Sequence, residues 1–219
     1  MRTATALLAC AFFLLGCAGG GKGPDVPVGA FNLSGAHARG NPNASILIVE
    51  YSDFECPFCG LAAESAKSML ASHGQRVRFI YKHFPLNGNC NPALQSAGHA
   101  RACAAAEAAE CAGQQGRFWE YHDLLFAENI AAQKTLRAPD FSDAGLRALA
   151  SSLGLDASLF DACLSSHNTL PKVRSDAAEG SRLSVQGTPT FFVNGKRAVG
   201  ALSPSEWDAL LRNVDGNLG

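Results

Sequence analysis

The 219-residue chain has little charge and no concentration of one sign. Lys and Arg total 18, Asp and Glu total 19, and the net charge is -1. Cations scattered in this way provide no footprint for nucleic acid or for electrostatic adhesion to an anionic membrane. The sequence also lacks a repeat period of the kind that solenoids have. We therefore expect one domain whose partners are proteins or small molecules, with no nucleic acid.

The chain also lacks the ligands of a structural zinc site, which usually come as two separated pairs. C-x-x-C occurs once, at Cys56 and Cys59, and no H-x-x-x-H occurs. The histidines are scattered, and each is expected to be an ordinary surface or core residue: His37, His73, His83, His99, His122 and His167. The sequence predicts no metal and no cofactor.

The N-terminal apolar run is too short to span a bilayer. Arg2 precedes an apolar stretch from Ala6 to Leu15, and small residues follow. This is the pattern of a signal peptide. We expect residues 1–16 to be removed on export.

The end of this segment, "LLGC" at Leu14 to Cys17, resembles the bacterial lipobox. The resemblance implies that Cys17 is lipidated and that the Gly- and Pro-rich residues 17–27 form a flexible tether. The protein would then lie in the bacterial cell envelope, on the periplasmic side of a membrane. The alternative is ordinary cleavage near Gly16, with Cys17 unmodified.

Export changes the interpretation of the remaining cysteines. Of the eight, Cys10 belongs to the signal and Cys17 to the lipid, which leaves six. These are Cys56, Cys59, Cys90, Cys103, Cys111 and Cys163. An even set in an oxidising compartment indicates disulfides.

The first half of the mature chain shows a strand-helix-strand pattern. Val28 to Leu33 is expected to form a short edge strand, and Ile46 to Phe54 a buried central strand. Pro57 suits the first position of a helix that continues to about Leu70. Arg76 to Phe84 alternates as a second strand, which predicts a right-handed β-α-β crossover.

The second half is helical and then returns to β structure. Helical spacing extends from Ala100 to about Ser184. Thr190 to Val193 reads as a strand, and Asn194-Gly195 predicts a hairpin to a short strand near Ala198. A capped helix after Ser203 completes β-β-α.

The spacing of Cys56 and Cys59 favours redox exchange, since a structural staple there would close a very small loop. A helix N-terminus stabilises an anion, so Cys56 should have a lowered pKa. Cys59 lies one turn further in, with less access. Cys56 is then the sulfur that a substrate attacks, and Cys59 is the resolving partner.

Four motifs now carry a family resemblance. "VEYSDFECPFC", "YKHFPL", "GRFWEYHDLLF" and "GTPTFFVNG" occur in the order typical of the DsbA-type branch of the thioredoxin superfamily. The resemblance implies an α/β thioredoxin fold over residues 28–219 with an all-helical insertion at about 90–184. It also implies a monomeric, exported thiol-disulfide oxidoreductase that oxidises unfolded or reduced exported proteins. A quinone-linked membrane oxidase of the DsbB or vitamin K epoxide reductase type would recharge it.

The resemblance assigns roles around the thiols. Thr188-Pro189 matches the cis-proline that lies against the disulfide, where the backbone of Thr188 can pair with an extended substrate; a trans proline at an edge strand is the alternative. Pro57 and Phe58 are expected to face the substrate. The best-known members carry histidine where this chain has Phe58, which cannot donate a hydrogen bond to the thiolate. A loss of about 1.4 kcal/mol of thiolate stabilisation would lower the potential by roughly 30 mV.

Glu50 interrupts the apolar strand six residues before Cys56. The resemblance implies an acid beneath the disulfide that tunes the thiols. Lys82 on the neighbouring strand could pair with it, although we favour a Lys82 that has no role at this site. For Glu50, the alternative is a strand-end acid that faces water.

Four cysteines remain, with three pairings. In one helix, Cys103 and Cys111 would be about 12 Å apart, too far for a bond. We favour Cys90 with Cys103, and Cys111 with Cys163 as in some DsbA relatives.

Three functions compete at this point. The first is a dithiol oxidase, and the second is a disulfide reductase or isomerase in the same compartment. The third is a non-catalytic thioredoxin-fold lipoprotein that only binds a partner, which does not require Cys56, Cys59 and Pro189 together.

Overall fold

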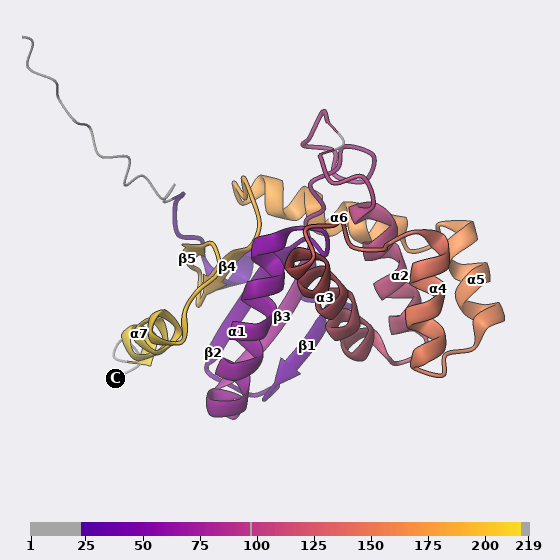
Figure 1. Ribbon diagram of the computed structural model, residues 1–219. Helices are drawn as coiled ribbons and strands as arrows, with labels where there is room; N and C mark the ends of the chain where they lie inside the picture. Colours follow the sequence, from indigo (N-terminus) through magenta and orange to yellow (C-terminus); the bar gives the residue numbers. More distant parts are fainter. Residues whose placement is uncertain (1–22, 97, 216–219) are drawn as a thin grey trace, which may run out of the picture.

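The computed structural model describes residues 23–96 and 98–215 (Figure 1). The expected signal peptide at 1–16 and the lipidation site Cys17 lie outside the described residues. Both therefore stay predictions.

A five-stranded mixed sheet forms the centre of the molecule, in the order β1-β3-β2-β4-β5. The strands are β1 (His37–Gly40), β2 (Ile46–Ser52), β3 (Val77–His83), β4 (Thr190–Val193) and β5 (Lys196–Val199). β2 and β3 are parallel, and the other neighbours are antiparallel. Every residue of β2 is buried, as its apolar, β-branched sequence predicts.

Helix α1 (Pro57–His73) connects β2 to β3, with Pro57 at its start. Five helices then lie between β3 and β4: α2 (Ala102–Gln114), α3 (Phe118–Lys134), α4 (Asp143–Ser152), α5 (Ala157–Ser166) and α6 (Leu170–Arg182). Helix α7 (Pro204–Asp215) ends the described chain. The predicted fold class, a thioredoxin fold with an inserted helical subdomain, is confirmed (Figure 1).

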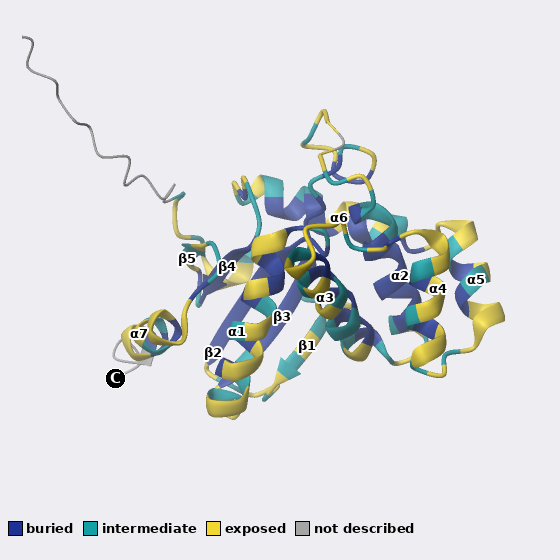
Figure 2. Ribbon diagram, in the orientation of Figure 1, coloured by how far each residue is buried: buried dark blue, intermediate teal, exposed yellow. Residues whose placement is uncertain are grey.

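Helices cover both faces of the sheet. Apolar side chains of α1 and α7 pack with Ile46, Ile48 and Phe191 on one face. Ala177 of α6 packs with Tyr51 on the other. Figure 2 shows the buried central strands, while the outer surfaces of α4, α5 and α7 are exposed. A third cluster joins the two free thiols to the helical insertion.

Two disulfides fasten the insertion, in the pairings that the sequence favoured. Cys111 and Cys163 join α2 to α5. Cys90 and Cys103 tie the segment after β3 to the first turn of α2. The first helix of the insertion begins at Ala102, so the preceding residues are an anchored loop.

The expected edge strand at Val28 to Leu33 is wrong. Val28–Ala30 is a short 3-10 helix after Pro27, and the edge position beside β3 belongs to His37–Gly40. A strand needs a free sheet edge to pair with. The edge of β3 is already paired with β1, where His37 lies opposite Tyr81, so it is not open to Val28 to Leu33.

The last residues of the expected tether, 23–27, are also not free. The amide of Val26 donates to the carbonyl of Gly195 at 2.9 Å, and the amide of Arg197 donates to the carboxylate of Asp25 at 3.1 Å. Gly195 has φ +84°, and a Cβ there would lie 1.9 Å from the Val26 oxygen. The hairpin glycine therefore serves both the turn and the docking of this segment.

Candidate active site

The two unpaired cysteines lie where β2 turns into α1. Cys56 is the N-cap residue of α1, and Cys59 lies in its first turn. Cys56 is 4% exposed and lies next to the exposed Pro57 and Phe58, whereas Cys59 has no exposed surface. Both cysteines are buried, but the dithiol is asymmetric: Cys56 keeps a small exposed area and Cys59 keeps none.

The asymmetry extends to acidity. A hydrogen bond from Cys59 lowers the pKa of Cys56 to about 6, against the opposing effect of burial. Burial, followed by the neighbouring Cys56 sulfur, raises the pKa of Cys59 well above its ordinary value. At neutral pH, Cys56 is therefore mostly thiolate and Cys59 a thiol.

The loop before β4 brings Thr188 and Pro189 against the dithiol. The Thr188-Pro189 peptide bond is cis. The Cys56 thiol, when protonated, donates to the Thr188 carbonyl at 3.4 Å. The Thr188 carbonyl therefore lies beside Cys56, and Pro189 follows it through a cis bond, whereas their roles in exchange stay a prediction.

The surface around Cys56 is apolar. Phe58 is 62% exposed and Leu61 is 47% exposed, both on the first turns of α1. Their side chains face solvent although each has apolar surface to bury. Pro57 is exposed as well, and its carbonyl accepts from Gln133 of α3 at 3.2 Å.

Glu50 is buried in β2, at 1% exposure. Burial raises its pKa to about 8, with Ser52 acting in the opposite direction and Cys56 adding to the rise. One of its carboxyl oxygens has no hydrogen-bond partner among the described residues. Glu50 is therefore a neutral acid near the thiols at pH 7, and the water-facing alternative is wrong.

Lys82 is not the partner of Glu50. Its ammonium lies 3.0 Å from Asp176 and 3.3 Å from Glu179, both on α6. In the parallel register Glu50 lies opposite Tyr81, and the next residue along β3 points to the other face. Lys82 therefore anchors α6 to the sheet.

Sequence reasoning missed two residues that hold the active-site corner, the turn from β2 into α1 that carries Cys56. Asn129 of α3 donates from its side-chain amide to the carbonyls of Phe54 at 2.8 Å and Cys56 at 3.3 Å. A Cβ at Gly60 would lie 2.7 Å from the Asn129 oxygen, so the glycine permits this approach. Nothing in the local sequence signals the role of Asn129.

Asp53 is the second missed residue, and its side chain has no exposure. Its carboxylate accepts from the amides of Glu55 at 2.7 Å and Leu86 at 2.8 Å, and contacts His99 Nδ1 at 2.7 Å. The bond to the amide two residues on is a usual habit of aspartate in turns, so part of this pattern was readable from sequence.

The described residues form neither a cluster of metal ligands nor a membrane-spanning helix. Among the described residues, no group of three or more His, Cys, Asp or Glu side chains could hold a metal ion. Within residues 23–96 and 98–215, no helix combines the length and apolar character needed to cross a bilayer.

A free dithiol at the start of a helix, a cis-proline loop beside it and a helical insertion define a member of the thioredoxin fold class. A family model described as Thioredoxin matches residues 32–213. The chain belongs to this thioredoxin family.

Solved structures share the fold at low sequence identity. A thioredoxin-like oxidoreductase from Silicibacter pomeroyi has a TM-score of 0.67 at 21% identity, covering 83% of this chain and 92% of that one. The thiol-disulfide exchange protein alpha-DsbA2 from Wolbachia pipientis has a TM-score of 0.66 at 19% identity, covering 85% and 89%.

Curated relatives are more similar in sequence but much longer. The Na(+)/H(+) antiporter NhaA 1 of Salinispora arenicola is 39% identical over 165 residues, which cover 75% of this chain and 22% of that protein. The chain thus spans about a fifth of the length of the first curated relatives it matches. The antiporter name describes proteins of which this chain matches only a part.

Proposed function

We propose that the chain is an exported thiol-disulfide oxidoreductase that transfers the Cys56–Cys59 disulfide to the thiols of unfolded or reduced exported proteins. One observation carries the proposal: Cys56, which keeps 4% exposure and has a pKa of about 6, lies one turn from the fully buried Cys59, whose pKa is raised. A binding protein has no use for this difference in acidity, whereas disulfide exchange depends on it.

The reaction follows from the two acidities. A substrate thiolate attacks Sγ of Cys56 in the oxidised pair, the S–S bond breaks, and Cys59 leaves with the electron pair and takes up a proton. The second substrate thiolate then attacks the substrate sulfur of the mixed disulfide. Cys56 departs as a stable thiolate, and two electrons have passed from the substrate to the pair.

Glu50 is suited to move the proton of the buried thiol. The pKa of its carboxyl is about 8, and the charged carboxylate raises the pKa of Cys59. A neutral Glu50 can donate as Cys59 leaves, and its carboxylate can accept when Cys59 must attack. Without such a group, the thiolate of Cys59 would form in an apolar environment at high cost.

The substrate site is proposed to be the surface around Cys56. The backbone of Thr188 can pair with an extended peptide, as sheet edges do in other peptide complexes. Exposed Phe58 and Leu61, with Pro57, provide the apolar contact that an unfolded chain offers and a folded chain withholds. Such a surface favours unfolded partners without demanding one sequence.

Net oxidation also needs a route for the electrons. We propose a quinone-linked membrane oxidase of the DsbB or vitamin K epoxide reductase type as the acceptor, and a monomer held at the periplasmic side by a lipid on Cys17. The Wolbachia structure is of a thiol-disulfide exchange protein, which supports the chemistry.

The test is the equilibrium of the Cys56–Cys59 pair with glutathione, together with single-turnover exchange with a reduced two-cysteine peptide. We expect the oxidised protein to convert the peptide to its disulfide, because a stable Cys56 thiolate favours the reduced protein. If the reduced protein instead reduced the peptide disulfide under the same conditions, the chain would be a reductase. If neither direction proceeded, the proposed function would fail.

The lipid anchor makes a separate prediction. Cys17→Ala should release the exported protein from the membrane fraction while its exchange with the peptide is unchanged in vitro, because a lipid chain supplies the membrane affinity and not the chemistry. The check is fractionation of cells that express each form. A membrane fraction unaffected by the substitution would exclude the anchor.

A further inference from the structure

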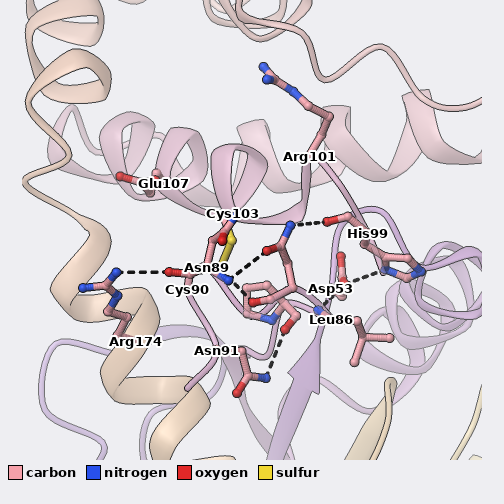
Figure 3. Close-up of a disulfide and its surroundings, with 12 residues drawn as sticks. Asp53, Leu86, Asn89, Cys90, Asn91, His99, Arg101, Cys103, Glu107 and Arg174 are labelled. Atoms are coloured by element: carbon pink, nitrogen blue, oxygen red, sulfur yellow. Dashed lines mark hydrogen bonds and ion pairs between the residues drawn. A yellow bond between two sulfur atoms is a disulfide. The ribbon is translucent and has the colours of Figure 1, made fainter. Parts of the chain in front are cut away.

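The segment between β3 and α2 lies over the active-site corner and delivers one histidine to it. Figure 3 shows His99 and Leu86 converging on Asp53, beside the Cys90–Cys103 disulfide. Asp53 Oδ2 receives both the Leu86 amide at 2.8 Å and the ring of His99 at 2.7 Å. Asp53 lies three residues before the reactive Cys56, so this contact belongs to the dithiol's surroundings.

His99 is held firmly in this place. Its amide donates to the Leu86 carbonyl at 3.1 Å, and its own carbonyl accepts from the Asn87 side chain at 2.7 Å. The disulfide Cys90–Cys103 closes the same segment onto α2. The ring is 25% exposed, so it can exchange protons with solvent while Asp53 fixes its position.

The charges around His99 are mainly negative. Asp53 raises the pKa of His99 most strongly through their hydrogen bond, and Cys56 and Glu55 raise it further. Glu55 itself accepts from the Arg101 amide at 2.8 Å, whereas the Arg101 guanidinium extends to Asp143 and the Phe141 carbonyl. The Arg101 guanidinium therefore binds at the start of α4, and the His99 ring is the group that binds Asp53.

The carboxylate of Asp53 repels the Cys56 thiolate and so raises the pKa of that thiol. The interaction between two charges is reciprocal. Because the Cys56 thiolate stabilises the protonated ring of His99, the protonated ring stabilises the Cys56 thiolate by the same free energy. An imidazolium bound to Asp53 thus offsets the opposing carboxylate and adds attraction of its own.

We propose that His99 is a positioning residue of the dithiol: as a cation held by Asp53, it stabilises the Cys56 thiolate and so sets the potential of the pair. The proposal rests on the proposed function only in requiring that the pair exchanges disulfides. The stabilisation operates in a limited pH range, above the pKa of Cys56, where the thiolate exists, and below the pKa of His99, where the ring is charged.

The test compares three variants by thiolate absorbance against pH and by the glutathione equilibrium. His99→Gln should reduce the thiolate-to-thiol ratio of Cys56 about threefold at a given pH, a moderate effect because solvent screens a partly exposed charge. A threefold change corresponds to a potential about 14 mV lower. His99→Lys keeps a cation and should retain the native ratio.

The matched control is His73→Gln at the far end of α1. His73 is also bound to an aspartate, Asp208, at 3.0 Å and is 26% exposed. Its loss should leave the Cys56 titration unchanged, because the whole of α1 separates it from the dithiol. This control removes any general effect of replacing a histidine ion pair.

A second readout measures the coupling from the histidine side. In NMR titrations, the ring of His99 should have a higher pKa in the reduced protein than in the oxidised protein, because only the reduced form carries the thiolate. Equal values in the two redox states would overturn the proposal, as would Gln and Lys variants that shift Cys56 alike. A dithiol that exchanges with glutathione but ignores residue 99 would leave the proposed function intact. A dithiol that does not exchange at all would defeat both.

Discussion

Replacing Cys59 with serine should leave Cys56 joined to substrate proteins in mixed disulfides that persist, whereas Cys56→Ser should leave none. The buried thiol is the group that resolves the mixed disulfide from within, and a serine hydroxyl cannot attack a disulfide at neutral pH. Without Cys59, the Cys56 thiolate can still exchange with a disulfide but cannot close the pair. Both variants should lose net oxidation of the two-cysteine peptide by at least about a thousandfold, the usual scale for removing a nucleophile.

The measurement is non-reducing electrophoresis of the two variants expressed in cells, followed by mass spectrometry of the trapped complexes. The pairs Cys90–Cys103 and Cys111–Cys163 stay intact in both proteins, so their sulfurs provide an internal control. Equal trapping by both variants would contradict the assignment of Cys56 as the attacked sulfur.

The sequence predicted the parts of this site that neighbours along the chain determine. A β-branched run followed by Cys56 and Pro57 specifies a strand that ends and a helix that begins. The C-x-x-C spacing then places Cys59 where its hydrogen bond lowers the pKa of Cys56. Asn194-Gly195 likewise specified its own hairpin, because both residues adopt positive φ in it. These predictions depend on local stereochemistry, which a single sequence contains.

The sequence left a question open where the answer depends on which face of a strand is buried. Glu50 and Lys82 lie on adjacent strands, and sequence alone allowed them to meet. The register places Glu50 opposite Tyr81, and alternation then sends Lys82 to the face covered by α6. A shift by one residue in the register reverses this outcome, and no residue near either position fixes it.

Contacts made across the fold were equally inaccessible. Asn129 reaches the corner from α3, and His99 reaches it from the segment before α2. Each looks ordinary in the sequence, since neither belongs to a motif with a known spacing. Their roles appear only when the helical insertion is packed against the dithiol, which explains why His99 was expected to be an ordinary histidine.

The buried acid Glu50 gives the second large prediction. The free energy of unfolding of Glu50→Gln, relative to that of the native protein, should be higher at pH 8 than at pH 4.5. Burial raises the pKa of Glu50 from 4.5 to about 8 on folding. Between these values the folded chain holds a proton that the unfolded chain has lost, so stability falls as pH rises through this range. Between pH 4.5 and 8, the titration of this one carboxyl corresponds to a loss on the order of 4 kcal/mol. Glutamine cannot ionise and should not show this loss.

The check is urea unfolding of the native protein and the Gln variant at pH 4.5, 6 and 8, with the free energies compared as a double difference. Glu206→Gln on the surface of α7 is the control, since a hydrogen bond from the Ser203 amide lowers that pKa and places its effect below pH 4.5. The difference should be larger in the reduced protein, because the Cys56 thiolate also raises the pKa of Glu50. A double difference near zero would mean that Glu50 is charged and solvated in the folded state, and its proposed role as proton donor to Cys59 would then fail.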